Sequence, residues 1–316
     1  MKIGAFIIPT GVGASIGGFA GDASSWARKL AKKCKLIVNP NVVNAACFSG
    51  ITDNMLYVEG YTLDEFFKGN CSLRESYNNK IGVVFDKQIN KDVLNIHLNT
   101  INAVKTVYDI DIIGYEITKN EVGVNFYIDE CGNSTGNVKN LTTIKEAAQK
   151  LILKGADAIA IVCNFPEETS TDYENGNGVD PVGGVEAVIS HYISKELKVP
   201  CAHAPAFDNY SIEPKIVDKK CAAEYITPTF LPCILIGLNQ APIIKENKSE
   251  GICIDHLDFL VVPYNSIGGI PVLKMIENCK KVYCIKENHT VLNVTTENFN
   301  SKCVIINKYK DLLELI

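Results

Sequence analysis

Glycine pairs in this chain stand next to residues that could bind an anion or transfer a proton. Five glycines fall within residues 11–21, and the tetrapeptide at residues 15–18 recurs at residues 266–269. A third pair is Gly183-Gly184. Backbone N–H groups of such turns attract anions, as do the N-termini of the helices that follow. We therefore predict a glycine-lined cleft that binds the phosphate or carboxylate of a small anionic metabolite. The expected ligand-binding residues are Gly13, Ser15, Gly17, Gly18, Asp22, Asn41, Asn44, Gly183, Gly184, Ser266, Gly268 and Gly269.

Four acidic or imidazole side chains are the candidates for acid–base catalysis. Neutral imidazole and carboxyl groups can act as general acid and base, or can coordinate a divalent metal. No HExxH or H-x-H spacing occurs, so a divalent metal is weakly supported, no metal ligand is predicted and the cofactor stays open. We expect an enzyme whose reaction class the sequence leaves open. The expected catalytic residues are Asp180, Glu186, His203 and Glu59.

Cysteine chemistry offers a second interpretation. Cys163-Asn164 follows an apolar run and resembles the Cys-Asn of two-cysteine amino-acid racemases, with Cys201 or Cys233 as the partner thiol. A thiolate needs positive surroundings to lower its pKa, whereas the residues after Cys163 are acidic. A two-cysteine racemase or isomerase therefore remains an alternative enzyme. A non-catalytic sensor that closes over its ligand remains an alternative of another class.

The first glycine-rich loop carries no nucleotide-binding signature. Gly11-x-Gly13 is followed by Gly17 rather than by a glycine three positions on, and no Gly-Lys-Ser/Thr follows. NAD and ATP therefore have no specific support.

The elements that must position these groups alternate between strands and helices. Residues 3–8 form an apolar run that predicts a buried strand, and residues 23–34 predict the helix after the glycine loop. The same alternation resumes at residues 141–163 and at 259–285. Such alternation indicates parallel sheets, whose ligands sit at the carboxyl ends of the strands. We therefore predict an α/β fold with two or three Rossmann-like blocks, mostly parallel sheets and a β-arm near residues 111–131. The expected domains are residues 1–135, with the glycine-rich loop, and residues 136–316.

Composition and charge narrow the class of protein and its location. The chain has 316 residues and a formal net charge of −5, with no basic stripe that could neutralise nucleic-acid phosphates. Its 12 cysteines lie mostly in apolar runs without a CxxC pair, which is typical of reduced thiols in a cytosol. Neither a secretory signal nor an apolar run of about 20 residues is found. We therefore predict a cytoplasmic protein with a small anionic metabolite as its partner, without nucleic-acid or membrane partners, and homo-oligomerisation stays open.

Several short motifs are spread over nearly the whole chain. They are residues 13–22 (GASIGGFAGD), 57–61 (YVEGY), 178–191 (GVDPVGGVEAVISH), 200–205 (PCAHAP), 229–233 (TFLPC) and 287–292 (ENHTVL). In this combination the chain resembles a bacterial family filed as domain of unknown function 3326. The resemblance implies kinship over the full length and implies no particular activity.

Overall fold

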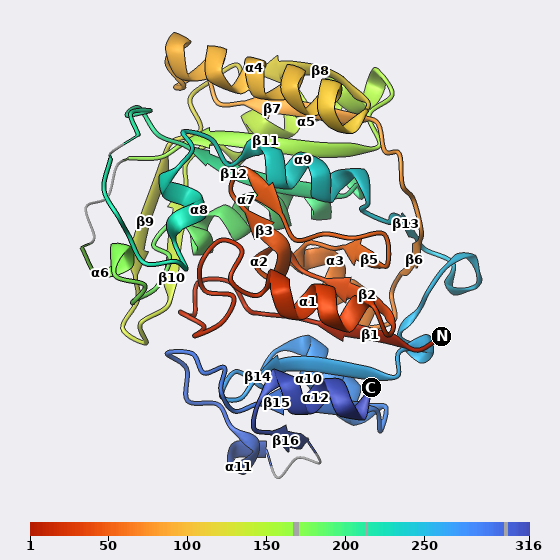
Figure 1. Ribbon diagram of the computed structural model, residues 1–316. Coiled ribbons are helices and arrows are strands. Elements are labelled where there is room, and N and C mark those ends of the chain that lie inside the picture. The colour runs from red at the N-terminus through yellow and green to blue at the C-terminus, as the bar shows by residue number, and fades with distance from the viewer. Residues whose placement is uncertain (167–170, 213, 300–302) are drawn as a thin grey trace.

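The computed structural model describes residues 1–166, 171–212, 214–299 and 303–316, and two parallel sheets dominate it (Figure 1). The larger sheet has the strand order β16-β15-β14-β1-β2-β5, and the smaller has the order β12-β11-β7-β8. Neighbouring strands in both sheets run parallel, which confirms the predicted α/β fold. The strands are β1 (Ile3–Phe6), β2 (Lys35–Val38), β5 (Met55–Tyr57), β14 (Phe259–Pro263), β15 (Lys281–Ile285) and β16 (Val304–Ile306) in the larger sheet, and β7 (Ile81–Phe85), β8 (Ile112–Ile117), β11 (Ala158–Asn164) and β12 (Cys201–Ala206) in the smaller.

Helices cover both faces of each sheet. Phe6 and Ile8 pack with α1 and α12 on one face of the larger sheet, whereas Ala5 and Ile7 pack with α3 and α10 on the other. Successive side chains of a strand point to opposite faces, so a strand covered on both faces is apolar throughout. The helices are α1 (Ser24–Ala31), α2 (Pro40–Val43), α3 (Gly60–Phe67), α4 (Lys91–Tyr108), α5 (Leu141–Leu153), α6 (Thr171–Glu174), α7 (Gly183–Leu197), α8 (Ala222–Tyr225), α9 (Leu231–Asn239), α10 (Ile270–Glu277), α11 (Thr296–Phe299) and α12 (Tyr309–Leu315), with short 3-10 turns at Lys248–Glu250 and Ile254–His256.

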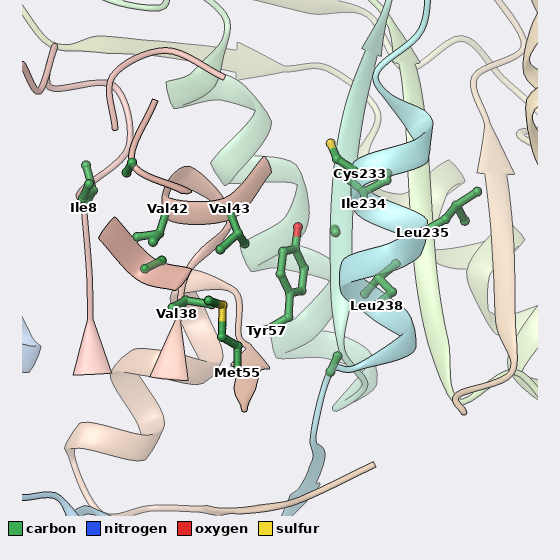
Figure 2. Packing of buried hydrophobic residues seen from close by; sticks show 14 of the residues in the cluster. Ile8, Val38, Val42, Val43, Met55, Tyr57, Cys233, Ile234, Leu235 and Leu238 are labelled. Carbon is green, nitrogen blue, oxygen red and sulfur yellow. The ribbon is translucent and has the colours of Figure 1, made fainter. Parts of the chain in front are cut away.

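Helix α9 joins the two sheets through a shared apolar core. Cys233, Leu235 and Leu238 on this helix belong to the same buried cluster as Tyr57, which ends β5 (Figure 2). Gly237 approaches the Tyr57 ring so closely that an added Cβ would lie 2.7 Å from Cε2. The same helix also contacts β11 and β12. This packing fixes the larger sheet against the smaller one, so the loops that follow β1 lie near β12.

The antiparallel hairpin lies further along the chain than the predicted β-arm near residues 111–131. It consists of β9 (Val124–Ile128) and β10 (Ser134–Val138), whereas β8 pairs with β7 in the smaller sheet. Because β8 is an edge strand with one exposed face, its sequence has the alternating pattern that also suits a free hairpin strand. The remaining short strands pair as β3 (Asn44–Ala45) with β4 (Phe48–Ser49) and β6 (Ser72–Arg74) with β13 (Ile243–Lys245).

Both main sheets take strands from either side of residue 135. In the larger sheet β1 lies between β2 and β14, and in the smaller sheet β7 lies between β8 and β11. The first and the last parts of the chain therefore share one sheet (Figure 1). The division into domains at residue 135 stays a prediction, although neither sheet follows it.

Candidate functional site

A cavity of about 760 Å³ lies at the carboxyl ends of β1 and β12, where parallel sheets place their ligands. Residues 9–14 and 17–20, after β1, supply one wall, and residues at the start of α7 supply another. Strand β12 contributes His203 and Pro205, and further lining residues come from 40–46, 173–174 and 207–234. A cavity of this size is typical of sites for small molecules.

Many of the predicted site residues meet at this cavity. It is lined by Gly13, Gly17, Gly18, Asn41, Asn44, Asp180, Gly183, Glu186 and His203. Its lining does not include Ser15, Asp22, Glu59, Gly184, Ser266, Gly268 or Gly269. The structure thus brings together members of two glycine pairs and leaves the third, after β14, apart. That turn is tied to the C-terminal segment instead, because the N–H of Ile267 donates to the carbonyl of Val294 at 3.2 Å.

The amides of these glycine turns already have acceptors within the protein. The N–H of Gly17 donates to Asp22 Oδ1 at 2.7 Å, and that of Gly183 donates to Asp180 Oδ1 at 3.3 Å. The N–H of Gly184 donates to a serine hydroxyl at 3.0 Å. An anion would therefore find these donors satisfied. That these turns hold a phosphate or carboxylate stays a prediction, and at Gly17, Gly183 and Gly184 the protein's own oxygens already accept the N–H groups.

Close packing explains the glycines of the first loop. Gly17 has a φ of +92°, and an added Cβ would lie 2.0 Å from Cδ1 of Ile8. At Gly18 an added Cβ would lie 2.2 Å from the carbonyl oxygen of Ala14. At Gly17 both the backbone conformation and the close approach require glycine, and at Gly18 the close approach alone requires it. The loop is thus a tightly folded wall of the cavity.

Two buried asparagines hold this wall in place. Asn39 accepts from the N–H of Ile8 at 3.1 Å and donates to its carbonyl at 2.7 Å. Asn288 makes the same pair of bonds with Ile16, at 3.0 and 2.8 Å, and also donates to the hydroxyl of Tyr309 at 2.8 Å. The sequence reasoning did not identify Asn288 as a positioning residue, although the residue lies in one of the motifs that carried the resemblance.

Three predicted ligand-binding residues make bonds to other parts of the protein. Asn41 lines the cavity and donates to the carbonyl of Pro9 at 3.1 Å. Asn44 lines it as well, and its Oδ1 accepts from the hydroxyl of Tyr57 at 3.1 Å. Ser15, outside the cavity, donates to a backbone carbonyl at 3.0 Å. Each of these residues therefore helps to shape the loops after β1 and β2.

Glu186 and His203 lie side by side in the cavity wall. Nε2 of His203 is 3.7 Å from Oε2 of Glu186, and its Nδ1 is 2.9 Å from Oγ of Ser190. Burial lowers the pKa of His203 from 6.5 to about 3. Burial, and then the charges of Asp180 and Glu224, raise the pKa of Glu186 well above its ordinary value of 4.5. Burial thus favours the uncharged form of both groups, a carboxylic acid beside a neutral imidazole.

Ser190 selects the tautomer of this imidazole. Its Oγ lies 3.4 and 3.3 Å from the carbonyls of Glu186 and Ala187, so the hydroxyl donates within α7. The oxygen can then accept the N–H of His203 Nδ1, which leaves the lone pair on Nε2 facing Glu186. Oε1 of Glu186 has no hydrogen-bond partner among the residues that the structure describes, although Glu186 is only 7% exposed. The pair thus presents one proton donor and one proton acceptor at the cavity.

Glu59 is a helix cap outside the cavity, so the predicted catalytic role is corrected. Its carboxylate accepts the N–H groups of Tyr61 at 2.7 Å and Thr62 at 2.6 Å, which satisfies the first turn of α3. Asp22 also positions the backbone, through its bond to Gly17. Burial raises the pKa of Asp22 to about 6.

Glu224 is a cavity residue that the sequence reasoning missed. Its Oε1 accepts from the N–H of Ala20 at 3.0 Å and from the hydroxyl of Tyr173 at 2.8 Å. Burial, and then the charge of Asp180, raise the pKa of Glu224 to about 8. No signal in the sequence marks it, because α8 is a single turn with neither a glycine pair nor a strand end beside it.

The three candidate cysteines do not form a two-thiol site. Cys163 and Cys201 are buried in the apolar core and do not line the cavity. Burial raises the pKa of both thiols well above the ordinary value of 9.0. Cys233 does line the cavity, and burial raises its pKa to about 12. Thiolates are therefore disfavoured at all three positions, which weakens the racemase alternative.

A metal centre has no candidate in the described part of the chain. No group of three or more His, Cys, Asp and Glu side chains there has the geometry to hold a metal ion. The cofactor stays open.

A family of proteins matches this chain over nearly all of its residues, including those that form both sheets and the cavity. The model of a family described as "Protein of unknown function (DUF3326)" matches residues 4–316. The chain belongs to this family. The resemblance inferred from the motifs is thereby confirmed, and the DUF3326 description names no activity. No solved structure matches the chain.

One relative of this DUF3326 chain bears on location. It is named an uncharacterized lipoprotein of Synechococcus sp. and is 35% identical over 296 residues, which cover 91% of this chain and 82% of the relative. The name points to a membrane-anchored location, so the predicted cytoplasmic location is corrected. Within the described ranges, none of the helices is both long enough and apolar enough to span a bilayer.

Proposed function

We propose that this chain is an enzyme that binds a small metabolite in the cavity and transfers a proton with Glu186 and His203. The observation that carries the proposal is a buried carboxyl group with an unpartnered oxygen beside an oriented imidazole. Buried polar atoms normally have partners, so an unpartnered oxygen at a cavity favours contact with a ligand. Paired groups whose pKa values move in opposite directions are typical of catalytic acids and bases.

The two side chains have complementary roles. Glu186 is the proton donor of the proposed reaction, since burial favours its protonated form, and Nε2 of His203 is the acceptor. The 3.7 Å between them is too long for a hydrogen bond, so both groups are free to contact one atom of a substrate between them. Ser190 does not line the cavity and acts as a positioning residue through Nδ1. Positioned proton donors and acceptors contribute about 10²–10⁴-fold to a rate.

Asp180 supports Glu186 in this proposal. Its Oδ1 accepts the N–H groups of Val182 at 3.1 Å and Gly183 at 3.3 Å, which shapes the start of α7. Its charge raises the pKa of Glu186 and so favours the protonated form. A sensor that binds without turnover would have no need of an oriented acid and base, which is why the enzyme is preferred. That the metabolite is a phosphate or carboxylate stays a prediction.

Incubation of the full chain with a metabolite extract, followed by untargeted mass spectrometry, tests the proposal. The wild type should consume a metabolite, and Glu186→Gln should consume it at least about 100-fold more slowly. Thermal shift should show that this variant still binds the same metabolite, because the cavity is retained. Glu196→Gln is the matched control, since Glu196 lies on the same helix and pairs with Lys145 at 3.1 Å. The control should keep full turnover.

Two outcomes would contradict the proposal. A metabolite that binds to the wild type but is never converted would identify a sensor. Equal turnover by the wild type and Glu186→Gln would remove the carboxyl group from the reaction.

A further inference from the structure

A second, smaller pocket adjoins the end of the glycine-rich loop. Its volume is about 280 Å³, and Ala20 is the one described residue that lines both this pocket and the larger cavity. The other walls come from α1, from the β3–β4 hairpin and from residues at and just before the start of α8. Gly21 has a φ of +92°, and an added Cβ there would lie 2.7 Å from the Cβ of Ala45. The loop and the hairpin are therefore in close contact, which fixes two walls of the pocket.

Basic side chains outnumber acidic ones in this second pocket. Arg28, Lys219 and Lys220 line it, whereas Asp22 is the one acidic residue of its described lining. Burial raises the pKa of Asp22 to about 6, and the charge of Lys220 opposes that rise, so Lys220 and Asp22 offset each other. Arg28 and Lys219 therefore remain in excess, although the chain as a whole has a formal net charge of −5.

The two cations in excess are available to a ligand. Arg28 and Lys219 are exposed, and neither makes a hydrogen bond or an ion pair with a residue in the described ranges. Lys220 is more constrained, because its Nζ lies 5.1 Å from the ring centroid of Phe19 and donates to the carbonyl of Gly176 at 3.4 Å. A guanidinium group with free N–H donors suits bidentate contact with a phosphate. The pocket therefore favours an oxyanion.

A hydroxyl group and an aromatic ring complete the lining. Oγ of Ser49 accepts the N–H of Ile51 at 3.3 Å, and its own hydrogen has no acceptor among the described residues, so the hydroxyl can donate to a ligand. Phe48 also lines the pocket and is 56% exposed, although its side chain is large and apolar. An organic group packed on this ring would remove apolar surface from water. A ring beside cations therefore favours a phosphate that carries an organic substituent.

We propose that this pocket binds an organic phosphate monoester, with Arg28 and Lys219 on the phosphate group and Phe48 against the organic group. A phosphate monoester carries a charge of about −1.5 to −2 near pH 7, which these two cations would neutralise. A soluble metabolite and a lipid with a phosphate headgroup both present this chemistry. The site lies outside the cavity of Glu186 and His203, and the inference does not rest on the proposed function.

Calorimetric titration of the full chain with phenyl phosphate, inorganic phosphate and benzyl alcohol tests the inference. Phenyl phosphate should bind at least about tenfold more tightly than either of the other probes, and its affinity should fall as NaCl rises from about 0.05 to about 0.5 M. The double variant Arg28→Gln/Lys219→Gln should bind it at least about tenfold more weakly. Phe48→Ala should bind phenyl phosphate no better than inorganic phosphate, whose own affinity should not change.

A matched control removes the same charge elsewhere. Lys29 and Lys32 are exposed residues of α1 and its C-cap that do not line the pocket, so Lys29→Gln/Lys32→Gln should bind phenyl phosphate as the wild type does. Cosedimentation with phosphatidylcholine vesicles, with and without phosphatidic acid, separates the two sources of the phosphate. Retention on the phosphatidic acid vesicles that the pocket variant loses would assign a lipid headgroup. Binding of phenyl phosphate without such retention would assign a soluble metabolite.

Three results would overturn the inference. The first is that phenyl phosphate does not bind, and the second is that the wild type and Arg28→Gln/Lys219→Gln bind it equally. The third is that phenyl phosphate binds no more tightly than inorganic phosphate, which would reduce the pocket to a site for an adventitious ion only. The substituted residues do not line the larger cavity, so each of these results leaves the test at Glu186 unaffected.

Discussion

Nε2 of His203 lies 3.7 Å from Oε2 of Glu186, and burial moves the pKa values of the two groups in opposite directions. Burial favours the unprotonated imidazole and the protonated carboxyl group, because each of these forms carries no charge. An ion pair at the same place would require both groups to be desolvated in their charged forms. The neutral pair is the form in which each group can give or take one proton.

The lowered pKa of His203 predicts a loss of stability in acid. The unfolded chain binds a proton at this residue below pH 6.5, whereas the folded chain resists it until about pH 3. Stability therefore falls as pH decreases through this window. His203→Gln removes the effect. In calorimetry, the Tm of the wild type should fall more than that of the variant as the pH is lowered through this window. The difference should be about 2–4 °C for each kcal/mol by which protonation of His203 destabilises the folded chain. Parallel Tm curves would contradict the prediction.

The raised pKa of Glu224 predicts the opposite trend at higher pH. Between 4.5 and about 8 the unfolded chain loses this proton while the folded chain keeps it, so stability falls as pH rises. Glu224→Gln never ionises and should gain at least about 2 °C in Tm relative to the wild type across that window. Glu196→Gln should follow the wild type. A variant that lost stability relative to the wild type as pH rose would contradict the assignment.

The repeated tetrapeptide offers a matched pair of substitutions. In Gly18→Ala the new Cβ would meet the carbonyl of Ala14 at 2.2 Å, whereas in Gly269→Ala its nearest neighbour, a carbon of Pro271, lies at 3.7 Å. Gly18→Ala should lower the free energy of unfolding in urea by roughly 1–3 kcal/mol or more. Gly269→Ala should stay within about 0.5 kcal/mol of the wild type. Similar effects at both positions would show that the two turns have the same packing.

Asn288→Ala should loosen the wall of the cavity. The substitution leaves the N–H and carbonyl of Ile16 and the hydroxyl of Tyr309 without their partner, and Asn288 is fully buried. Each orphaned group costs about 1–3 kcal/mol, so the three together should lower the free energy of unfolding in urea by at least about 3 kcal/mol. Limited proteolysis should then cleave within residues 11–21 earlier than in the wild type. Unchanged stability would show that water replaces all three bonds.

Native alkylation tests the burial of the candidate thiols. Cys131 and Cys279 are exposed and should react with iodoacetamide within the first minutes. Cys163 and Cys201 should react only after unfolding, because they are buried and their pKa values are raised. Peptide mass spectrometry gives the extent of labelling at each cysteine. Rapid labelling of Cys163 in the folded protein would restore the two-cysteine alternative.

The fold was predictable because its information is local. Apolar runs such as residues 3–8 form strands that are buried on both faces, and helices alternate with these strands along the chain. The sequence also indicated Glu186 and His203. Glu186 follows a glycine pair closely, and His203 lies on a strand that ends at the cavity. In contrast, the single turn that holds Glu224 depends on its approach to Ala20, which no local pattern encodes.

Two errors came from patterns with more than one physical cause. A carboxylate directly before a helix suits a cap as well as a catalytic acid, and Glu59 is the cap. Gly17 and Gly268 stand in identical tetrapeptides after neighbouring strands, yet only Gly17 lines the cavity. At the turn of Gly268, the N–H of Ile267 bonds to the carbonyl of Val294. Val294 is distant in the sequence, so the repeated tetrapeptide does not indicate this contact.

The position of β1 between β2 and β14 has a consequence for synthesis. Ile16 makes its two hydrogen bonds with Asn288, which lies 272 positions later, and the second neighbour of β1 is β14. While the ribosome is still translating the middle of the message, the first strand exposes an unpaired edge, which can pair with other chains. A nascent chain of this protein therefore has a long interval in which the edge of its first strand is open to pairing with other chains.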